Sequence, residues 1–426
     1  MAGTMTRSSE HLLLLVSTTG YTGNAFREAA TRLGVAMIVG SDRCHVLADQ
    51  WPEDGMLTLD FRDPDVAVDQ IVMAAAARKI RAILPSSELT ATIAARASAR
   101  LDLPHNAPEG AAAAGNKAWM RARLRAAGVR SPRARTHEIN EDPRVIAASV
   151  TYPCVLKPLL LSASRGVIRA DSPPSFVAAW TRIKALLALP ELLARDPIEG
   201  AKILVEAFVP GFEVAVEGLL TAGALRVLAI FDKPDPLDGP YFEETIYVTP
   251  SRLAGATQRA IAETTAAAAR ALGLREGALH AELRINEEGA WVIEVAARSI
   301  GGLCGRALRF GVDMTLEELL VRHAMGIEMI TLDLERERAA SGVMMIPIPR
   351  AGILEQVGGI EAAKGVRGID DVSVRSLGTR VAPPPDGDAY LGFIFAHGES
   401  PGFVESALRE AHALLDLQIT PLLTKL

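Results

Sequence analysis

The sequence is poor in cysteine and in aromatic residues. Its 426 residues include three cysteines, Cys44, Cys154 and Cys304, and phenylalanine, tryptophan and tyrosine together make up 5%. An odd number of cysteines without a CxxC pair argues against a disulfide framework and against a zinc site. Reduced thiols are typical of the cytoplasm, so we expect a cytoplasmic protein.

Long hydrophobic runs and an excess of charge of one sign are also missing. The apolar run 12–16 is far shorter than the roughly 20 residues of a membrane-spanning helix, and it does not form the hydrophobic part of a signal peptide. Lysine and arginine number 45 against 51 aspartates and glutamates, for a net charge of −6. Without a basic stripe, neither nucleic acid nor a membrane is expected as a partner.

What is present is a globular composition with a clear alternation of elements. Hydrophobic residues make up 49% of the chain and charged residues 23%, which is typical of soluble globular proteins. Residues 11–110 alternate apolar strands, such as 11–17 and 82–85, with helical segments such as 66–79 and 89–99. This order predicts βαβ units on a parallel sheet, and therefore an α/β domain over residues 1–110.

The rest of the chain has a different pattern. An antiparallel region at 202–248 and a hairpin at 279–297 stand between helices, and the tail shows short strands, turns and a helix at 402–415. We expect the tail, 331–426, to form a separate α+β domain, with the proline-rich stretch 382–388 as a surface loop. The fold class is thus α/β and α+β.

The first strand is not followed by a full GxGxxG motif, so a dinucleotide site is weakly supported there. Another strand end is more informative. Pro85, Ser86, Ser87 and Glu88 follow a predicted strand, at the position where open sheets bind ligands. These residues could contact substrate or only cap the next helix, and the sequence favours neither.

The hairpin carries the clearest chemical pattern. Read with a period of two, Leu279, Ala281, Leu283 and Ile285 form an apolar face that Trp291, Ile293, Val295 and Ala297 continue. The opposite face carries His280, Glu282, Arg284, Glu294 and Arg298. A turn centred on Glu288 would place Glu282 directly opposite Glu294.

Two glutamates in such a pair repel each other and destabilise a sheet. A bound magnesium ion would turn this cost into a gain, because Mg²⁺ takes carboxylate oxygens and keeps phosphates as further ligands. Neutralisation by Arg284 and Arg298 on a solvated face explains the pattern equally well.

Two further segments suit a nucleotide, although each pattern is common in proteins without one. Lys157 ends an apolar strand and precedes the small-residue loop 162–166, whose backbone amides could approach a phosphate. The strand ending at Glu206 leads through an apolar connector to Glu213. Such a connector could hold a flat heterocycle, and the acid could accept hydrogen bonds from ribose.

In their order and spacing, these pieces together resemble the ATP-grasp superfamily, and within it the L-amino-acid ligases that make dipeptides. The resemblance covers nearly the whole chain. It implies a pre-ATP-grasp domain over 1–110, a two-lobed ATP-grasp domain over 111–330 and a C-terminal domain over 331–426. The smaller lobe is expected at about 111–200 and the larger lobe at about 201–330.

The resemblance also implies roles for residues that match the family motifs. Lys117 and Lys157 would bind nucleotide, the loop Ser162, Ala163, Ser164, Arg165 and Gly166 would close over the phosphates, and the hinge Glu206, Ala207, Phe208 and Val209 would hold adenine. Glu213 would bind ribose, Glu282 and Glu294 would bind Mg²⁺, with Mn²⁺ as an alternative, and Arg298 would steady the acyl phosphate and the tetrahedral intermediate.

The sequence departs from the family pattern at several positions. Ala296 stands where many relatives have a third metal ligand, asparagine, and Tyr247 stands where a histidine near the substrate amine is expected. Glu244 is kept in that substrate segment. Gly301 and Gly302 replace a bulky residue, which would enlarge the acceptor pocket.

Asp232 and Lys233 correspond to residues that face the cleft in relatives, and Lys233 would reach the γ-phosphate or substrate unless the two form only a surface pair.

The implied reaction is ATP-dependent ligation of a carboxylate to an amine through an acyl phosphate, with small-molecule substrates. A homodimer is a further expectation, since dimers are common among relatives. A carboxylase resembling biotin carboxylase and a non-catalytic ATP-binding protein are the alternatives. The sequence lacks a Met-Lys-Met biotin-attachment signature.

Overall fold

The computed structural model describes residues 10–17, 22–42, 55–193, 198–311, 313–327, 339–387 and 390–422. Cys44 and the predicted domain boundary at residue 330 lie outside these ranges. The fold class predicted from the sequence, a parallel-sheet α/β part joined to α+β parts, is confirmed.

The N-terminal part is a parallel four-stranded sheet in the order β3-β2-β1-β4, flanked by helices. Its strands are β1 (His11–Leu15), β2 (Ala36–Ser41), β3 (Met56–Thr58) and β4 (Ile80–Pro85), and its helices are α1 (Gly23–Leu33), α2 (Pro64–Ala77) and α3 (Glu88–Arg100). The short strand β3 was not predicted, because three residues carry too little periodicity.

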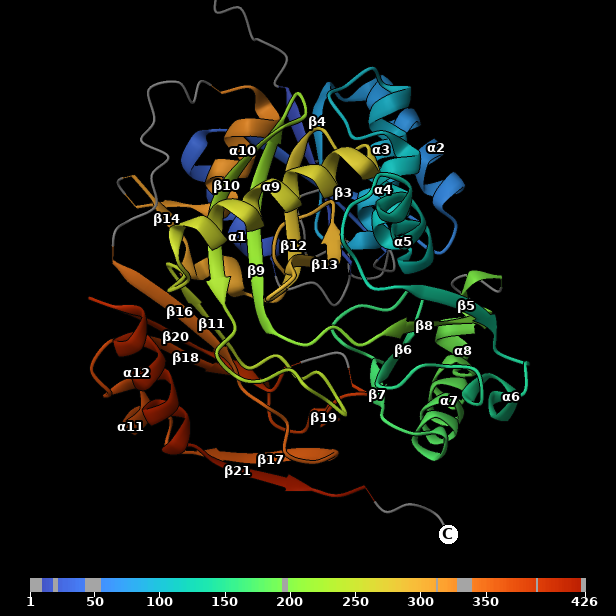
Figure 1. Ribbon diagram of the computed structural model, residues 1–426. Coiled ribbons are helices and arrows are strands. Elements are labelled where there is room, and N and C mark those ends of the chain that lie inside the picture. The colour runs from blue at the N-terminus through green and yellow to red at the C-terminus, as the bar shows by residue number, and fades with distance from the viewer. Residues whose placement is uncertain are drawn as a thin grey trace, which may run out of the picture.

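The smaller lobe is an antiparallel sheet in the order β5-β8-β6-β7, at the lower right of Figure 1. It consists of β5 (Ala134–Glu138), β6 (Cys154–Pro158), β7 (Ile168–Ala170) and β8 (Lys202–Ala207), with α6 (Pro143–Ala147), α7 (Pro173–Leu187) and the short α8 (Pro190–Leu193) and η2 (Glu199–Ala201). Phe176 and Trp180 of α7 stack at 6.0 Å and fill the core under this sheet.

The lobe limits differ from the predicted ones. Because β8 pairs with β5 and β6, the smaller lobe extends past residue 200 to Ala207. Helices α4 (Pro108–Gly115) and α5 (Lys117–Ala126) instead contact α9 (Gly255–Leu272) on the larger lobe. The outer boundaries at 110 and 330 stay predictions.

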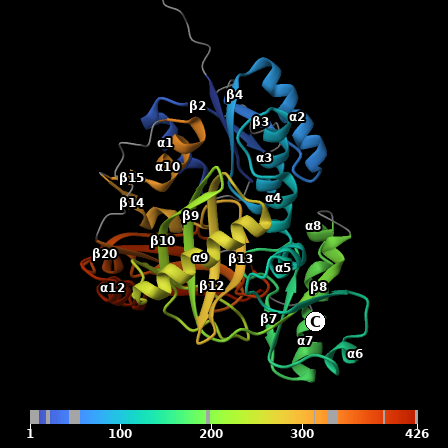
Figure 2. The same ribbon diagram turned by 45° about the horizontal axis from the view of Figure 1, so that its top comes forward.

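One eight-stranded sheet joins the larger lobe to the tail, in the order β13-β12-β9-β10-β11-β16-β20-β18. The larger lobe supplies β9 (Phe212–Thr221), β10 (Ala224–Asp232), β11 (Ile246–Thr249), β12 (Gly277–Asn286) and β13 (Gly289–Ala296), and the tail supplies β16 (Ala340–Met345), β18 (Ile369–Val374) and β20 (Gly392–Gly398). Helix α9 lies across β9, β12 and β13 (Figure 2). The tail has its own core and shares its sheet with the larger lobe, and the separate domain expected over 331–426 stays a prediction.

The remaining elements close the tail and the junction. Helices α11 (Ile360–Lys364) and α12 (Pro401–Ala413) pack on the tail strands, and a small sheet of β17 (Gly352–Gly358), β19 (Arg380–Val381) and β21 (Asp416–Thr420) lies beside them. Between the larger lobe and the tail run η3 (Cys304–Ala307), β14 (Arg309–Phe310), β15 (Met314–Thr315) and α10 (Leu316–Met325).

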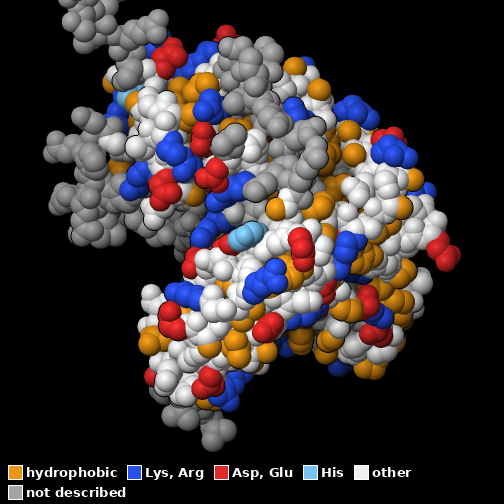
Figure 3. All heavy atoms as spheres, turned by 90° about the vertical axis from the view of Figure 1, so that its left-hand side faces the viewer, with side chains coloured by type: hydrophobic (Ala, Val, Ile, Leu, Met, Phe, Trp, Pro, Cys, Tyr) orange, Lys and Arg blue, Asp and Glu red, His pale blue; other side chains and the backbone are white. Residues whose placement is uncertain are grey.

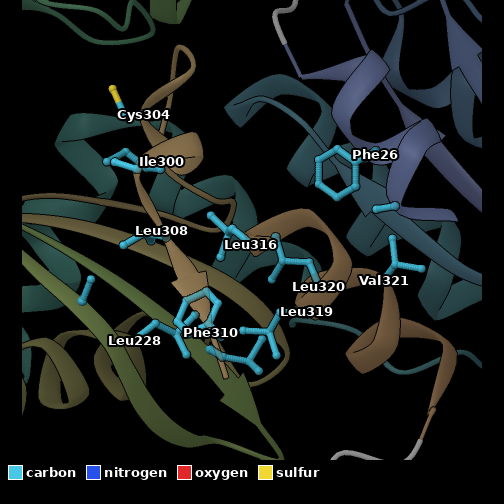
Figure 4. Close-up of a cluster of buried hydrophobic side chains, with 14 of the residues drawn as sticks. Phe26, Leu228, Ile300, Cys304, Leu308, Phe310, Leu316, Leu319, Leu320 and Val321 are labelled. Atoms are coloured by element: carbon cyan, nitrogen blue, oxygen red, sulfur yellow. The ribbon is translucent and has the colours of Figure 1, made fainter. Parts of the chain in front are cut away.

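A hydrophobic cluster ties the N-terminal sheet to the larger lobe. Figure 4 shows Phe26 of α1 facing Leu320 and Val321 of α10, while Phe310 and Leu228 lie on the side of the sheet. Ile300 and Cys304 belong to the same buried cluster. The loop that follows Arg298 is therefore anchored in a packed core, which fixes one wall of the site.

None of the described helices is both long enough and apolar enough to cross a bilayer. On the face shown in Figure 3, acidic and basic side chains are interspersed over the described surface.

A close approach between chain segments fixes the start of β9 against the end of β12. Gly211, which precedes β9, has φ 125°, and a Cβ there would lie 2.2 Å from the Ile285 carbonyl oxygen at the end of β12. We expect Gly211→Ala to destabilise the protein by about 1–3 kcal/mol, because the backbone must leave a region that only glycine adopts easily. The destabilisation is measured as a melting temperature below that of the unsubstituted protein.

Gly200→Ala is the matched control, because a Cβ at Gly200 meets nothing within 4 Å. Equal melting temperatures for the two variants would contradict the close approach.

Candidate active site

A cavity opens between the smaller lobe, the hairpin β12–β13 and the end of β4. The predicted site residues that line it are Lys117, Lys157, Ser162, Ala163, Ser164, Glu206, Ala207, Phe208, Val209, Glu213, Glu244, Tyr247, Glu282, Glu294, Arg298, Gly301 and Gly302. Arg165 and Gly166 of the predicted loop are the exceptions. A Cβ at Gly166 would lie 2.6 Å from Pro158 Cγ, so this glycine packs against the end of β6.

The two hairpin glutamates are opposite each other, but not for the reason predicted. The turn pairs Asn286 with Gly289, so it is centred between Glu287 and Glu288. A bulge then shifts the register between Leu283 and Glu282, and Glu282 pairs with Glu294. The bulge inserts Ile293 as an extra residue on β13.

The bulge also changes which side chains of β13 face the core. Val292 and Val295 are buried in the core beneath the hairpin, whereas Ile293 lines the cavity. Trp291 pairs with Arg284, on the polar side. The predicted apolar face containing Trp291 and Ile293 was therefore wrong, because strict alternation fails at a bulge.

Glu206 contributes its side chain as well as its backbone. It is 2% exposed, and its carboxylate accepts hydrogen bonds from Arg121 Nε and Lys157 Nζ, both at 2.8 Å. Burial opposes the charge, yet Arg121 and Lys157 hold the pKa of Glu206 below its usual range. This carboxylate fixes Lys157 at the cavity wall.

Lys117 begins α5, whose N-terminus is capped by Asn116 as predicted. Its Nζ donates to the Leu161 carbonyl at 2.6 Å and lies 3.7 Å from Glu294 Oε1. Lys117 therefore stands between the start of the loop 162–166 and the pair of Glu282 and Glu294.

The loop 162–166, which is expected to cover the phosphates, has a defined shape. Ala163 and Ser164 both have positive φ, 53° and 56°. The tail holds the loop from outside, since Gly166 N donates to Pro385 O at 2.8 Å and Arg165 Nε donates to Asp386 O at 3.1 Å. The described part of the proline-rich stretch is thus packed against the smaller lobe rather than only exposed.

Two backbone amides of the hinge, residues 206–209, already donate hydrogen bonds within the protein. Ala207 N donates to Arg133 O at 2.9 Å, and Phe208 N donates to Pro153 O at 3.1 Å. A heterocycle at the hinge would therefore meet the Val209 amide as its nearest uncommitted donor. Arg284 Nη1 binds the Val209 carbonyl at 2.9 Å and keeps this turn in place.

Lys233 is buried behind the cavity and does not line it. Its ammonium contacts Glu213 at 2.9 Å, Glu244 at 2.7 Å and Glu282 at 3.3 Å. Its neighbour Asp232 points elsewhere and binds Arg252. The expectation that both residues face the cleft was wrong, because adjacent strand residues point to opposite faces.

These contacts influence the charges of Glu244 and Glu282. Burial opposes the charge of Glu244, but Lys233 lowers its pKa to about 2. Glu244 also accepts hydrogen bonds from Tyr247 at 2.6 Å and Tyr390 at 3.1 Å. Burial raises the pKa of Glu282 well above its usual value, with Glu244 adding to the effect.

Arg298 is bound to the N-terminal part. Its guanidinium contacts Glu88, with Nε at 3.1 Å from Oε1, and Nη1 donates to Ser299 O at 2.6 Å. Ser87 caps α3 through a capping box, and Ser86, Ser87 and Glu88 all line the cavity. The capping role that the sequence left open is confirmed, and contact with substrate stays a prediction for these cavity-lining residues.

A buried pair supports the hairpin from behind. Glu217 is 0% exposed, accepts the Ile300 amide at 2.9 Å and lies 3.5 Å from His280 Nδ1. His280 Nε2 lies 3.7 Å from Glu282 Oε1. Through His280, Glu217 thus connects the loop after Arg298 to the pair of Glu282 and Glu294.

Two groups of acids could hold a cation. Glu213, Glu244 and Glu282 have ligand atoms within 4.8 Å of one another, but the Lys233 ammonium already contacts all three. Glu282 and Glu294 form a cross-strand pair that lines the cavity, and the Glu294 side chain is 27% exposed with Lys117 at 3.7 Å. A hard cation with oxygen ligands fits the second group.

Sequence reasoning missed two contributors to this site, Arg121 and Tyr390, and it named a third, Glu88, without its contact to Arg298. Arg121 is one helical turn after Lys117, so helix periodicity could have placed both on one face. Glu88 could be placed only as a strand-end residue. Tyr390 comes from the tail and had no local signal.

The comparisons with known proteins agree with this arrangement. An ATP-grasp domain model matches residues 150–307, an ATP-grasp N-terminal domain model matches 27–105, and an L-amino acid ligase C-terminal domain model matches 344–420.

Several known proteins are similar over much of the chain. Alanine–anticapsin ligase of Bacillus subtilis is 30% identical over 302 residues, which are 66% of this chain and 63% of that protein. Dapdiamide A synthase of Enterobacter agglomerans is 28% identical over 229 residues, 52% of this chain and 51% of that protein. The chain thus spans less than two thirds of these ligases.

The crystal structure of an L-amino acid ligase from Bacillus licheniformis has the same fold, with a TM-score of 0.78 and 24% identity over 97% of this chain and 100% of that one. With three matching domain models and a cavity between two lobes, the chain belongs to the ATP-grasp superfamily and carries the C-terminal domain of the L-amino acid ligases.

Proposed function

We propose that the protein is an ATP-dependent ligase that joins a small carboxylate to an amine, with an amino acid as a substrate. The observation that carries this proposal is one cavity lined by a carboxylate pair that could hold a metal, by Lys157 of the smaller lobe, by Lys117 at the start of α5, and by Arg298. The similar proteins that carry names of ligases support the same reaction class.

In the first step, a substrate carboxylate oxygen attacks the γ-phosphorus of ATP, and the bond to the β-phosphate oxygen breaks. Lys117 and Lys157 hold phosphate oxygens, and the loop 162–166 covers them and excludes water. Mg²⁺ on Glu282 and Glu294 would supply positive charge for the phosphate oxygens. The products are an acyl phosphate and ADP.

In the second step, the amine attacks the acyl carbon, loses a proton, and inorganic phosphate leaves. Arg298, held by Glu88 and the Ser299 carbonyl, points its guanidinium to the cavity and stabilises the oxyanion. No side-chain nucleophile is required. This fits the thiol of Cys154, whose pKa burial raises to about 12.

We further propose that the enzyme works in the cytoplasm, where ATP is available and buried thiols stay reduced. The homodimer expected from the resemblance stays a prediction, which light scattering after size-exclusion chromatography decides.

The reaction is tested by phosphate release from ATP and Mg²⁺ with the twenty amino acids, singly and in pairs, followed by mass spectrometry. We expect release that needs both members of a pair, with a product mass equal to their sum minus water. Omission of Mg²⁺ is the control and should abolish release. Release that needs bicarbonate instead would overturn the proposal in favour of a carboxylase.

The metal assignment is tested at the hairpin. We expect Glu294→Gln and Glu294→Ala to lower kcat for phosphate release by about 100-fold or more, because phosphoryl transfer loses its charge compensation. The melting temperature should stay near that of the unsubstituted protein. Glu288→Gln, at an exposed position of the same hairpin, is the matched control. Normal turnover in the Glu294 variants would sink the assignment.

The ion pair of Asp386 with Arg182 of α7 helps to keep the tail against the smaller lobe and the loop 162–166, and it therefore predicts an effect on nucleotide binding. Asp386 accepts hydrogen bonds from Arg182 Nε at 3.0 Å and Nη2 at 2.7 Å, and Asp386 is half exposed. For such a pair we expect Asp386→Asn to raise the KM for ATP about 2- to 5-fold. Asp416→Asn, exposed elsewhere on the tail, should leave KM unchanged. Equal KM values in both variants would contradict a holding role.

A further inference from the structure

The space beside Gly302 is filled by the tail. Gly302 has φ 60°, and a Cβ there would lie 3.1 Å from Phe393 Cε1 and 3.5 Å from Tyr390 Cε2. A side chain at this position would press against two aromatic rings from a segment that is distant in sequence. Gly301 is different, because a Cβ there would have its nearest neighbour, Arg298 Nη1, at 3.9 Å.

The sequence predicted a roomier pocket from these two glycines. The structure corrects this for Gly302, because the room that a missing side chain would leave is taken by Tyr390 and Phe393. The glycine at position 302 therefore allows the two aromatic rings to approach the backbone closely. Of these two glycines, only Gly301 has open space where a side chain would lie.

Of the two rings, Tyr390 is the one that lines the cavity. Phe393 is 3% exposed, stacks on Phe395 at 6.2 Å, and belongs to the core. Tyr390 packs edge-on against Phe393 at 5.6 Å, so the core supports its ring from behind.

The Tyr390 ring is also fixed at its other end. Its hydroxyl donates to Glu244 Oε2 at 3.1 Å, and Oε1 of the same carboxylate binds Lys233 and Tyr247. A ring held by packing on one side and by a buried, charged acceptor on the other cannot easily turn away from a bulky ligand. It forms a rigid wall.

We propose that Tyr390 is a specificity-determining residue, which limits the size of the substrate side chain that fits beside Gly301 and Gly302. The inference rests on the proposed ligase function and deepens it. The expected preferred substrate at this place is an amino acid with a small side chain, and larger ones are excluded by the Tyr390 ring. In hydrophobic pockets each methylene changes kcat/KM by about 10- to 200-fold, so a missing ring should be easy to detect.

The test compares Tyr390→Ala, Tyr390→Phe and the control Leu377→Ala, which changes an exposed tail residue. Glycine, alanine, valine, leucine and phenylalanine are each supplied with ATP, Mg²⁺ and a fixed co-substrate. We expect Tyr390→Ala to raise the ratio of kcat/KM for leucine to that for alanine at least 10-fold. Tyr390→Phe keeps the ring and should keep the ratio of the unsubstituted protein.

A second readout separates this inference from the ligase function. With ADP and Mg²⁺ present, the shift in melting temperature caused by each amino acid reports binding without turnover. We expect leucine and phenylalanine to stabilise the alanine variant more than the unsubstituted protein. If no panel member gives turnover, the ligase proposal fails, while these shifts still decide the role of Tyr390. An unchanged size order in Tyr390→Ala, in both readouts, would overturn the inference.

Discussion

The site depends on buried carboxylates that are each neutralised by a partner from another element. Glu206 is held by Arg121 and Lys157, and Glu213 by Lys233 and Arg284. A buried charge without a partner costs several kcal/mol, so these pairs fix the distance between the smaller lobe, the hairpin and helix α5. Glu294 has Lys117 at 3.7 Å, and Glu282 opposite it shares Lys233 with Glu213 and Glu244. A bound cation would supply further positive charge at this pair.

The continuous sheet explains how the tail takes part in the site. Strand β20 pairs with β16, and β16 pairs with β11, whose Tyr247 lines the cavity. Side chains before β20 are thus placed by the same hydrogen-bond ladder as those of the larger lobe. A tail joined only by a linker could not hold the Tyr390 ring a few ångströms from Gly302, in the loop after Arg298. Rigidity of the sheet is what makes a specificity role for the tail physically reasonable.

Much of this could be predicted from the sequence, and the failures have identifiable causes. Helix α9 and the cap at Asn116 follow from periodicity and local hydrogen bonding, whereas the predicted pairing of Glu282 with Glu294 is met only because a bulge compensates for a turn placed half a residue away. The bulge at Ile293 could not be foreseen, because the inserted residue is apolar like its neighbours. The apolar face was therefore assigned wrongly although the glutamate pair was right. Contacts between distant segments, such as Tyr390 with Glu244, leave no trace in local spacing.

The tail segment before β20 contacts the cavity region at two places, the loop 162–166 and Glu244. Its Pro385 and Asp386 hold the loop expected to cover the phosphates, and Tyr390, a few residues on, closes the opposite end of the cavity against Glu244. An acyl phosphate is destroyed by water, so a ligase gains if the nucleotide side and the acceptor side close together. Both contacts come from one short stretch of chain, so the two sides of the cavity are linked covalently. This arrangement requires that Gly166 and Gly302 stay small, because aromatic rings or proline rings of neighbouring segments occupy the space at both positions.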